Sequence, residues 1–213
     1  MELRLTEIFH SLQGESRTVG RPTVFVRLTG CPQRCVWCDT EYAFSGGEKW
    51  TLAAIREQVA AHGAQYVTVT GGEPLAQPNC LTLLTALCDD GYQVSLETGG
   101  AMDIAGVDER VSVVMDLKAP GSGEQHNNRL ENIPLLKAHH QVKFVLADRK
   151  DYDWARFMLD QHQLHKRVSD VLFSPVQDGL APGELADWIV ADRLPVRFQL
   201  QLHKYLWNDA RGR

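Results

Sequence analysis

Three cysteines stand within eight positions of one another in the segment GCPQRCVWCDT, residues 30–40. Cys31, Cys35 and Cys38 follow a C-x3-C-x2-C spacing, and Pro32 excludes a regular helix at the start of the segment. A structural zinc site takes four protein ligands, commonly as two C-x2-C pairs, and the sequence offers no second pair. Three thiolates suffice for three irons of a cubane cluster, which leaves the fourth iron open to an added ligand. The spacing therefore favours a [4Fe-4S] cluster with one open corner.

The rest of the sequence indicates in which cellular compartment, and with which partners, such a protein would work. Charges at Glu2, Arg4 and Glu7 interrupt the N-terminal segment, so it lacks the apolar run of a secretory signal, and no stretch of about 18 apolar residues follows. We expect a cytoplasmic protein, in which thiols stay reduced and clustered cysteines serve metal or redox chemistry. A net charge of -5 without a long basic run argues against a nucleic acid as partner. A membrane partner is not expected either.

Short β-rich runs alternate with helical patterns along the chain. We expect strands at residues 23–30, 66–72, 93–100, 111–118, 141–148, 170–176 and 196–203, and helices at 51–62, 79–90, 129–139, 152–163 and 182–192. This alternation predicts an α/β protein with a parallel sheet whose outer face is covered by helices. Eight strands close a complete barrel, so about six core strands predict a partial, open parallel β/α barrel, with residues 1–213 as a single domain.

Unusual residues follow the predicted strands. The segments RLTGC, TGGEP, ETGG, DLKAP, SPVQ and QLHK each fall at the carboxyl end of an expected strand. Ligands bind at that edge in parallel α/β architectures, so the pattern predicts one broad site. The remaining cysteines, Cys80 and Cys88, lie among leucines on a helical pattern and are expected to be packed core thiols.

The cysteine segment resembles the radical S-adenosylmethionine (SAM) superfamily. Cys31, Cys35, Trp37 and Cys38 match its C-x3-C-x-aromatic-C signature, and GGEP at residues 71–74 matches a second element. The resemblance implies a barrel of the radical SAM type, with the open iron chelated by SAM and Trp37 near its adenine. Gly72 would allow a close backbone approach, and Glu73 would accept from the methionine ammonium.

Nearly the whole chain resembles the 7-carboxy-7-deazaguanine synthase family. The matching segments are FHSLQGE (9–15), FVRLTGCPQRCVWCDT (25–40), TGGEP (70–74), LETGG (96–100), MDLKAPGSGE (115–124), VKFVLADRKDY (142–152), SPV (174–176) and LQLHKYLW (200–207). The resemblance implies a carbon-nitrogen lyase that converts 6-carboxy-5,6,7,8-tetrahydropterin to 7-carboxy-7-deazaguanine by radical ring contraction with loss of ammonia, in queuosine and deazapurine biosynthesis. It also implies Mg2+, a flavodoxin or ferredoxin electron donor, and a homodimer.

The same resemblance implies a role for individual residues. Thr40 would bind magnesium, and the expected SAM-binding residues are Trp37, Gly72, Glu73, Glu97, Asp116, Lys118, Ser174 and Gln177. The expected substrate-binding residues are Leu12, Gln13, Gly14, Glu15, Arg27, Thr70 and His203. Arg27 interrupts an apolar strand, where an unpaired cation would be costly, and a guanidinium matches a carboxylate with two hydrogen bonds. No protein acid or base is assigned, since the radical would come from SAM.

Some alternatives stay open on the sequence. Glu15 could be a helix cap or a surface carboxylate, Asp116 and Lys118 a structural ion pair, and His203 a core residue. For the whole chain, a glycyl-radical-enzyme activating enzyme shares the cysteine motif, and a non-enzymatic iron-sulfur or zinc binding protein would use the cysteines alone. The segments SLQGE and CDT favour the synthase, because they suit a small anionic pterin with Mg2+.

Overall fold

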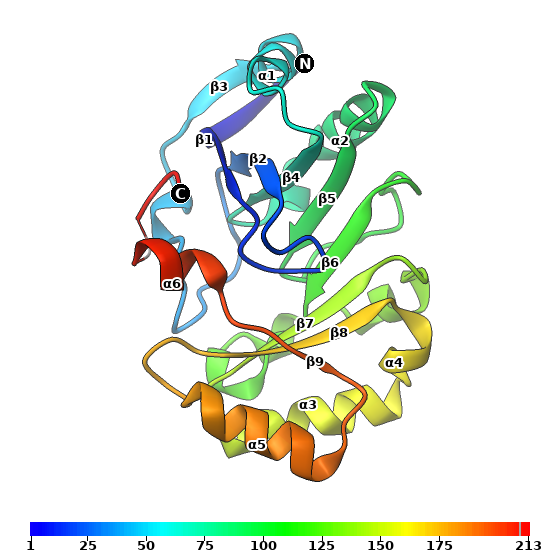
Figure 1. Ribbon diagram of the computed structural model, residues 1–213. Coiled ribbons are helices and arrows are strands. Elements are labelled where there is room, and N and C mark those ends of the chain that lie inside the picture. The colour runs from blue at the N-terminus through cyan, green and yellow to red at the C-terminus, as the bar shows by residue number, and fades with distance from the viewer. Residues whose placement is uncertain (209) are drawn as a thin grey trace.

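One curved sheet organises the protein (Figure 1). The computed structural model describes residues 1–208 and 210–213. The strands are β1 (Glu2–Leu12), β2 (Pro22–Leu28), β3 (Glu48–Thr51), β4 (Tyr66–Gly71), β5 (Gln93–Thr98), β6 (Ser112–Asp116), β7 (Gln141–Leu146), β8 (Asp170–Pro175) and β9 (Arg197–Phe198). Their order is β3-β1-β2-β4-β5-β6-β7-β8-β9, and pairing is parallel from β2 to β9. The predicted open, mainly parallel β/α barrel is confirmed.

Helices cover the outer face of this sheet. They are α1 (Leu52–Ala61), α2 (Cys80–Asp89), α3 (Arg149–Gln161), α4 (Leu164–Arg167) and α5 (Pro182–Asp192). The last helix, α6 (Leu202–Trp207), lies instead at the central opening of the barrel. Short 3-10 turns are η1 (Glu41–Ala43), η2 (Pro74–Ala76), η3 (Pro120–Ser122), η4 (Gln125–Asn127) and η5 (Leu130–Leu135). In Figure 1, α3 and α5 lie against β7 and β8, and α2 lies beside β5. The buried thiols of Cys80 and Cys88 on α2 belong to this outer core, as expected.

Alternation along β4 separates the core from the interior of the barrel. Val67 and Val69 are fully buried in the hydrophobic core, on the helix side. Thr68 and Thr70 point the other way, where their hydroxyls bond to Ser95 and Glu97 of β5. Because successive side chains on a strand face opposite sides, one strand supplies both an apolar outer surface and a polar inner one.

The sheet begins with an N-terminal strand that the sequence pattern did not indicate. β1 is antiparallel to β2 and to β3, so two antiparallel strands extend the parallel core at one edge. Only Leu3 and Leu5 of β1 are buried, because the strand lies near that edge. Its mixture of polar and apolar residues follows from this position.

Two predicted elements were wrong. A helix was expected over residues 129–139, but the segment forms the 3-10 turn η5 with Pro134 inside it, since proline removes a backbone donor and clashes with an α-helical turn. A strand was expected over residues 196–203, but β9 has two residues and α6 begins at Leu202. His203 therefore lies on a short helix and not at a strand end.

None of the helices in the described part of the chain is both long and apolar enough to cross a lipid bilayer.

Replacing Leu96 by alanine tests the outer core. Leu96 lies on the central strand β5 and is fully buried. We expect Leu96→Ala to lower the free energy of unfolding by about 2 to 5 kcal/mol, because a large buried side chain leaves a cavity. Urea unfolding of the purified protein measures this change. The matched control is Val190→Ala at an exposed position of α5, for which a change within about 0.5 kcal/mol is expected. Equal losses in both variants would contradict this assignment of the core.

Candidate active site

The polar interior of the barrel opens into a cavity of about 280 Å3, called here the central cavity. It lies at the carboxyl ends of the parallel strands, from Arg27 on β2 to Lys143 on β7. All the residues predicted for the site line it, except Glu73 and Ser174. Those that line it are Leu12, Gln13, Gly14, Glu15, Arg27, Cys31, Cys35, Trp37, Cys38, Thr40, Thr70, Gly72, Glu97, Asp116, Lys118, Gln177 and His203. These predicted residues therefore share one cavity at the strand ends.

The three clustered cysteines lie on the loop that follows β2. Two backbone groups of this loop are anchored to the segment after β6: the Arg34 amide donates to Glu124 Oε1 at 2.7 Å, and the Val36 amide donates to the Ser122 carbonyl at 3.0 Å. Partial burial raises the pKa of each thiol. The sulfurs of Cys31, Cys35 and Cys38 are thus held at one side of the central cavity by a fixed backbone.

Gly72 holds the end of β4 against the cysteine loop. A Cβ at this position would lie 2.3 Å from the Gly30 carbonyl oxygen and 2.8 Å from Cys31 Cβ. The amide of Glu73 donates to the same Gly30 carbonyl at 2.7 Å. Only glycine permits this separation, so the GGEP segment and the cysteine loop form one unit.

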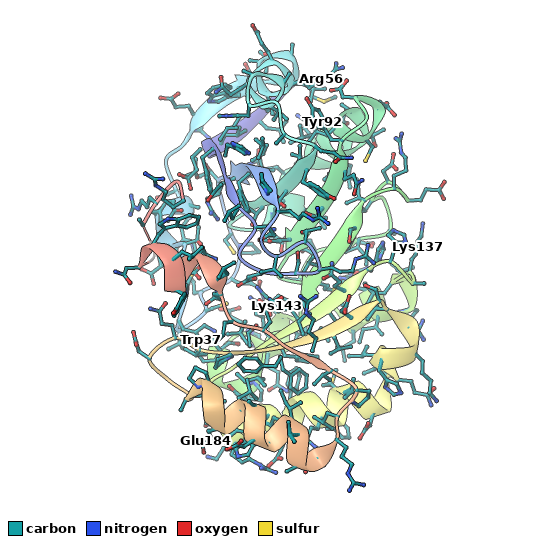
Figure 2. All side chains as sticks on the ribbon, in the orientation of Figure 1. Trp37, Arg56, Tyr92, Lys137, Lys143 and Glu184 are labelled. Carbon is teal, nitrogen blue, oxygen red and sulfur yellow. The ribbon has the colours of Figure 1, made fainter. Side chains whose placement is uncertain are left out.

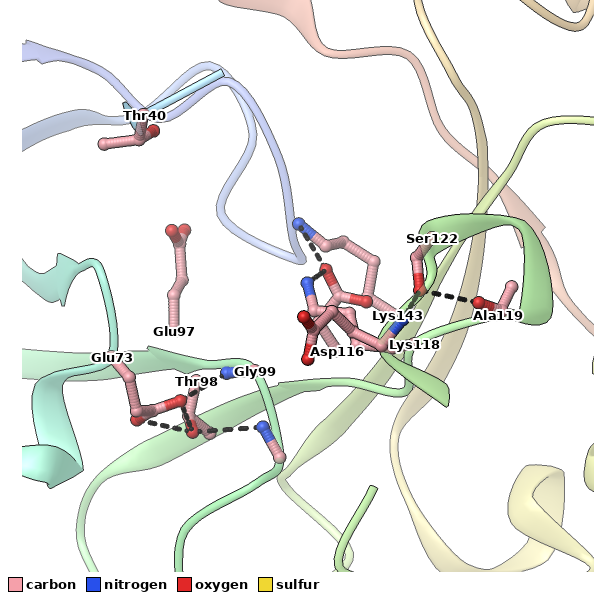
Figure 3. Close-up of polar contacts among 12 residues, drawn as sticks. Thr40, Glu73, Glu97, Thr98, Gly99, Asp116, Lys118, Ala119, Ser122 and Lys143 are labelled. Carbon is pink, nitrogen blue, oxygen red and sulfur yellow. Dashed lines mark hydrogen bonds and ion pairs between the residues drawn. The ribbon is translucent and has the colours of Figure 1, made fainter. Parts of the chain in front are cut away.

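Glu73 stabilises the adjacent strand ends. Its carboxylate accepts hydrogen bonds from the Thr98 hydroxyl at 2.9 Å and the Gly99 amide at 2.8 Å (Figure 3). It also accepts from the Leu75 amide at 3.1 Å. Burial raises the pKa of this carboxyl group. In this arrangement Glu73 joins the ends of β4 and β5 beneath the cavity. Ser174 is buried on β8, and its hydroxyl has no hydrogen-bond partner among the described residues.

A second group of polar residues lines the same cavity. Gln13 Nε2 donates to Glu97 Oε1 at 3.2 Å and to Thr68 Oγ1 at 3.1 Å, and Thr70 Oγ1 donates to Glu97 Oε2 at 3.0 Å. Glu15 is 6% exposed and pairs with Lys143 at 2.7 Å. Glu15 is therefore neither a helix cap nor a surface carboxylate.

The C-terminal segment closes against the same residues. The Leu202 amide donates to the Gly14 carbonyl at 2.9 Å, and a Cβ on Gly14 would lie 2.1 Å from His203 Nδ1. His203 reaches the cavity although it is helical, because the start of α6 packs directly on the connection between β1 and β2. Ala210, Arg211, Gly212 and Arg213 also line the cavity.

Arg27 is held in a fixed orientation at the wall of the cavity. Its Nε donates to Glu7 Oε1 at 2.8 Å, and Glu7 Oε1 also accepts from the Tyr42 hydroxyl at 2.9 Å. The guanidinium carbon lies 5.8 Å from the ring centroids of both Phe9 and Tyr42. With Nε used by Glu7, the two terminal nitrogens remain for an anion in the cavity.

Thr40 and Asp39 connect the cysteine loop to α6. The Thr40 hydroxyl donates to Asp39 Oδ1 at 2.8 Å, and Asp39 Oδ2 pairs with Lys204 Nζ at 2.9 Å. Although burial opposes ionisation, Lys204 and the Thr40 hydroxyl hold the pKa of Asp39 below its usual value. Thr40 and the ionised Asp39 place hard oxygen atoms at the cavity, the donor type that Mg2+ prefers.

Sequence reasoning missed several residues of the cavity. Lys143 is one of them, and the others include Phe9, Tyr42 and Lys204. The segment QVKFVLAD does carry a signal for Lys143, since a lysine between apolar residues of a central strand has to face a polar interior. Phe9 gives no such signal, because its contact with Arg27 depends on the pairing of β1 with β2.

Comparisons with known proteins identify this arrangement. The family model of the radical SAM superfamily matches residues 25–120, which include all three cysteines and the GGEP segment. The crystal structure of QueE from Escherichia coli superposes with a TM-score of 0.75 over 95% of each chain, at 22% identity, and so shares the fold. Fold and cysteine site together define a radical SAM protein.

Full-length relatives specify the family within this class. The chain is 46% identical to a 7-carboxy-7-deazaguanine synthase of Chlorobaculum tepidum, over 99% of this chain and 97% of that protein. It is 42% identical to one of Koribacter versatilis, over 97% of both chains. The chain belongs to the 7-carboxy-7-deazaguanine synthase family.

The residues present fit the cofactors of a radical SAM protein. Three partly buried thiols on one anchored loop suit a [4Fe-4S] cluster. Asp116 Oδ1 is buried without a hydrogen-bond partner in the described structure, and it borders the cavity where SAM would have to lie. No group of three or more His, Cys, Asp or Glu side chains in residues 1–208 and 210–213 converges on a single metal ion.

Replacing Gly72 by alanine tests the contact between the GGEP segment and the cysteine loop. The added methyl group has to displace the Gly30 carbonyl, so the loop should shift and lose affinity for the cluster. We expect Gly72→Ala to retain fewer irons per chain than the unchanged protein after anaerobic reconstitution, as measured by iron and sulfide analysis. The control is Gly183→Ala on α5, where a Cβ meets nothing within 4 Å. Full iron content in Gly72→Ala would contradict the proposed constraint.

Proposed function

We propose that this chain is a radical SAM lyase that converts 6-carboxy-5,6,7,8-tetrahydropterin to 7-carboxy-7-deazaguanine, with loss of ammonia. The observation that carries the proposal is the composition of the central cavity. The three thiols line it without a fourth cysteine among the described lining residues, together with the polar side chains of Gln13, Glu15, Arg27 and Glu97. Nearly full-length similarity to proteins named 7-carboxy-7-deazaguanine synthase supports the same activity. The product belongs to queuosine and related deazapurine biosynthesis.

Cys31, Cys35 and Cys38 would hold the cluster. When bound, the cluster and SAM supply the radical that removes a hydrogen atom from the substrate. Trp37, Gly72, Asp116, Lys118 and Gln177 border the part of the cavity proposed for SAM. Lys118 Nζ pairs with Asp116 Oδ2 at 2.9 Å, which fixes the carboxylate and leaves Oδ1 available to a ligand. The pair therefore serves the structure and the ligand together.

Three other residues of the proposed SAM site contribute differently. Glu73 supports the site by fixing the backbone of Gly99, and Ser174 offers a buried hydroxyl from β8. Glu97 lies between the SAM residues and the substrate residues, because it bonds to Gln13 and Thr70. We propose that Glu97 belongs to the boundary between the two ligands.

For the substrate we propose Leu12, Gln13, Gly14, Glu15, Arg27, Thr70 and His203. The two terminal nitrogens of the Arg27 guanidinium would donate two parallel hydrogen bonds to the substrate carboxylate. The amide of Gln13 and the carboxyl of Glu15 offer the donors and acceptors that the ring edge of a pterin requires. Thr40 would provide a hydroxyl ligand for Mg2+, with the remaining positions filled by substrate oxygens and water.

The domain organisation, the oligomeric state and the electron donor are also proposals. The continuous nine-stranded sheet supports one radical SAM domain over residues 1–213. The family resemblance supports a homodimer and an electron donor of the flavodoxin or ferredoxin type. The proposed small-molecule substrate agrees with the size and polar lining of the cavity.

Product analysis of the reconstituted enzyme tests the activity. With SAM, Mg2+, dithionite and carboxytetrahydropterin under anaerobic conditions, we expect 7-carboxy-7-deazaguanine to form, identified by mass spectrometry. Cys35→Ala should abolish both cluster binding and product, whereas Cys88→Ala should retain both, since Cys88 lies in the outer core. Cleavage of SAM by the unchanged protein without a deazapurine product would contradict the proposed function.

The variant Arg27→Lys tests recognition of the substrate carboxylate. Lysine keeps the charge but loses the planar pair of donors, and a charge-assisted hydrogen bond contributes about 1.5 to 3 kcal/mol. We therefore expect KM for the carboxylated pterin to rise by about tenfold or more. The control ligand is tetrahydropterin without the carboxylate, whose binding should be the same in both proteins. An equal loss for both pterins would show that Arg27 does not recognise the carboxylate.

A further inference from the structure

Lys143 is a buried cation for which the radical chemistry provides no role. It lies on β7 with 13% of its side chain exposed, and Figure 2 shows it in the middle of the molecule, whereas Arg56, Lys137 and Glu184 lie at the periphery. Its Nζ is 2.7 Å from Glu15 Oε2 and 3.7 Å from Asp116 Oδ2. An interior ammonium is costly unless its contacts compensate for lost hydration, so these contacts are specific.

The sheet fixes the position of Lys143 between the two halves of the cavity. Lys143 is the register partner of Asp116 on the neighbouring strand β6, and both side chains reach the cavity (Figure 3). Glu15 comes from the connection between β1 and β2, on the side proposed for the substrate. Lys143 therefore contacts one carboxylate from each ligand site.

Glu15 is held in place at both oxygens. Oε2 accepts from Lys143, and Oε1 accepts from Gln201 Nε2 at 2.6 Å. The backbone amide of Glu15 donates to Gln13 Oε1 at 3.1 Å. The carboxylate consequently has a defined orientation before any ligand arrives.

Glu97 is a second buried carboxyl group in the same cavity, but its surroundings differ. It accepts from the amide of Gln13 and from the hydroxyl of Thr70, and no cation lies within hydrogen-bond distance of it in the described structure. Since a hydroxyl accepts as well as donates, the contact with Thr70 persists when Glu97 carries a proton. Gln13 bonds to the carboxyl group of Glu97 and to the backbone amide of Glu15, and the charge of Glu15 acts on Glu97, so the two carboxyl groups share one part of the cavity.

The charges around the two groups separate their protonation. Burial alone would raise the pKa of Glu15, but Lys143 and His203 lower it overall. Burial and the charge of Glu15 raise the pKa of Glu97, and Lys143 and Arg27 offset only part of this. Asp116 and Lys118 complete the charged groups on the facing strand ends. The lowered pKa favours an ionised Glu15, which accepts hydrogen bonds, and the raised pKa favours a protonated Glu97, which can donate one.

We propose that Lys143 is a positioning residue that keeps Glu15 ionised, as an acceptor for N–H groups of the substrate ring, and leaves Glu97 as the protonated donor of the pair. This inference rests on the proposed function, because it concerns how the same cavity recognises a heterocycle. A pterin presents N–H groups and a carbonyl oxygen along its edges, so an acceptor and a donor that line the same cavity match it. Two ionised carboxyls would repel each other and offer no donor.

Equilibrium binding of carboxytetrahydropterin at several pH values tests the proposal. The reconstituted, SAM-loaded enzyme is titrated by calorimetry without reductant, from about pH 6 to about pH 9, so that no turnover occurs. Each dissociation constant is divided by that of the unchanged protein at the same pH, which cancels titration of the substrate itself. The variants are Lys143→Met, which removes the charge, and Lys143→Arg, which keeps it.

The dissociation constant of Lys143→Met, divided by that of the unchanged protein, should depend on pH. Without the ammonium, burial raises the pKa of Glu15 unopposed, so Glu15 is protonated at low pH and ionises as the pH rises. We expect binding weakened by about tenfold or more near pH 6, with the loss shrinking toward pH 9. Lys143→Arg should stay within about threefold at every pH. A ratio near one, or a constant loss at every pH, would overturn the proposal, because a merely structural lysine predicts no change of slope.

A second pair of variants keeps the test valid if Lys143→Met folds poorly. Glu15→Gln removes the titrating group, so adding Lys143→Met to this variant should introduce no further pH dependence of binding. The double variant also leaves no unpaired charge at these two positions, which favours correct folding. A pH slope that persists in the double variant would overturn the proposal.

The matched control is Lys49→Met, which removes an exposed lysine paired with Glu2 at 3.4 Å and should give a ratio of one throughout. If the unchanged enzyme neither binds nor converts the pterin, the proposed function fails and this inference with it. If the unchanged enzyme does both and the Lys143→Met ratio is flat, only the inference fails.

Discussion

Alternation of side chains along the parallel strands is the constraint on which the whole molecule depends. Val67 and Val69 pack outward under the helices, while Thr68 and Thr70, which alternate with them along β4, face inward. An incomplete barrel has no second layer to fill its interior with apolar side chains, so polar groups there remain available for ligands. The same pattern thus generates the hydrophobic core and the central cavity.

Charged groups inside the barrel lose hydration, and ion pairs between neighbouring side chains compensate for this loss. Glu15, Lys143, Asp116 and Lys118 form a continuous series of contacts between the two halves of the cavity. Each ion is desolvated but paired, which is the condition under which buried charges are tolerated. Glu97, without a cation at hydrogen-bond distance in the described structure, is the member of the group that best retains a proton. Stability and recognition of a polar ligand therefore involve the same residues.

Agreement between sequence and structure varies with the range of the interaction. The cysteine loop, Gly72 and the strand-end residues Glu97 and Asp116 line the cavity. The sequence could indicate these residues because short motifs and strand periodicity depend only on neighbours in the chain. His203 was expected at a strand end and reaches the cavity from α6 instead, since a two-residue strand leaves room for a helix that packs on Gly14. Glu73 and Ser174 lie beside the cavity without lining it, a distinction that depends on where their side chains point.

The sequence by itself determined the alternating α/β architecture and the open-cornered cysteine site, because spacing and periodicity are properties of the chain alone. It also determined the family, through segments that match from end to end. Only the tertiary structure decided that Lys143 pairs with Glu15, a residue 128 positions away, and that Glu7, Phe9 and Tyr42 orient Arg27. Such pairs depend on strand order and register, which bring distant segments within hydrogen-bond distance, and the sequence around one residue does not indicate which distant residue will be its partner.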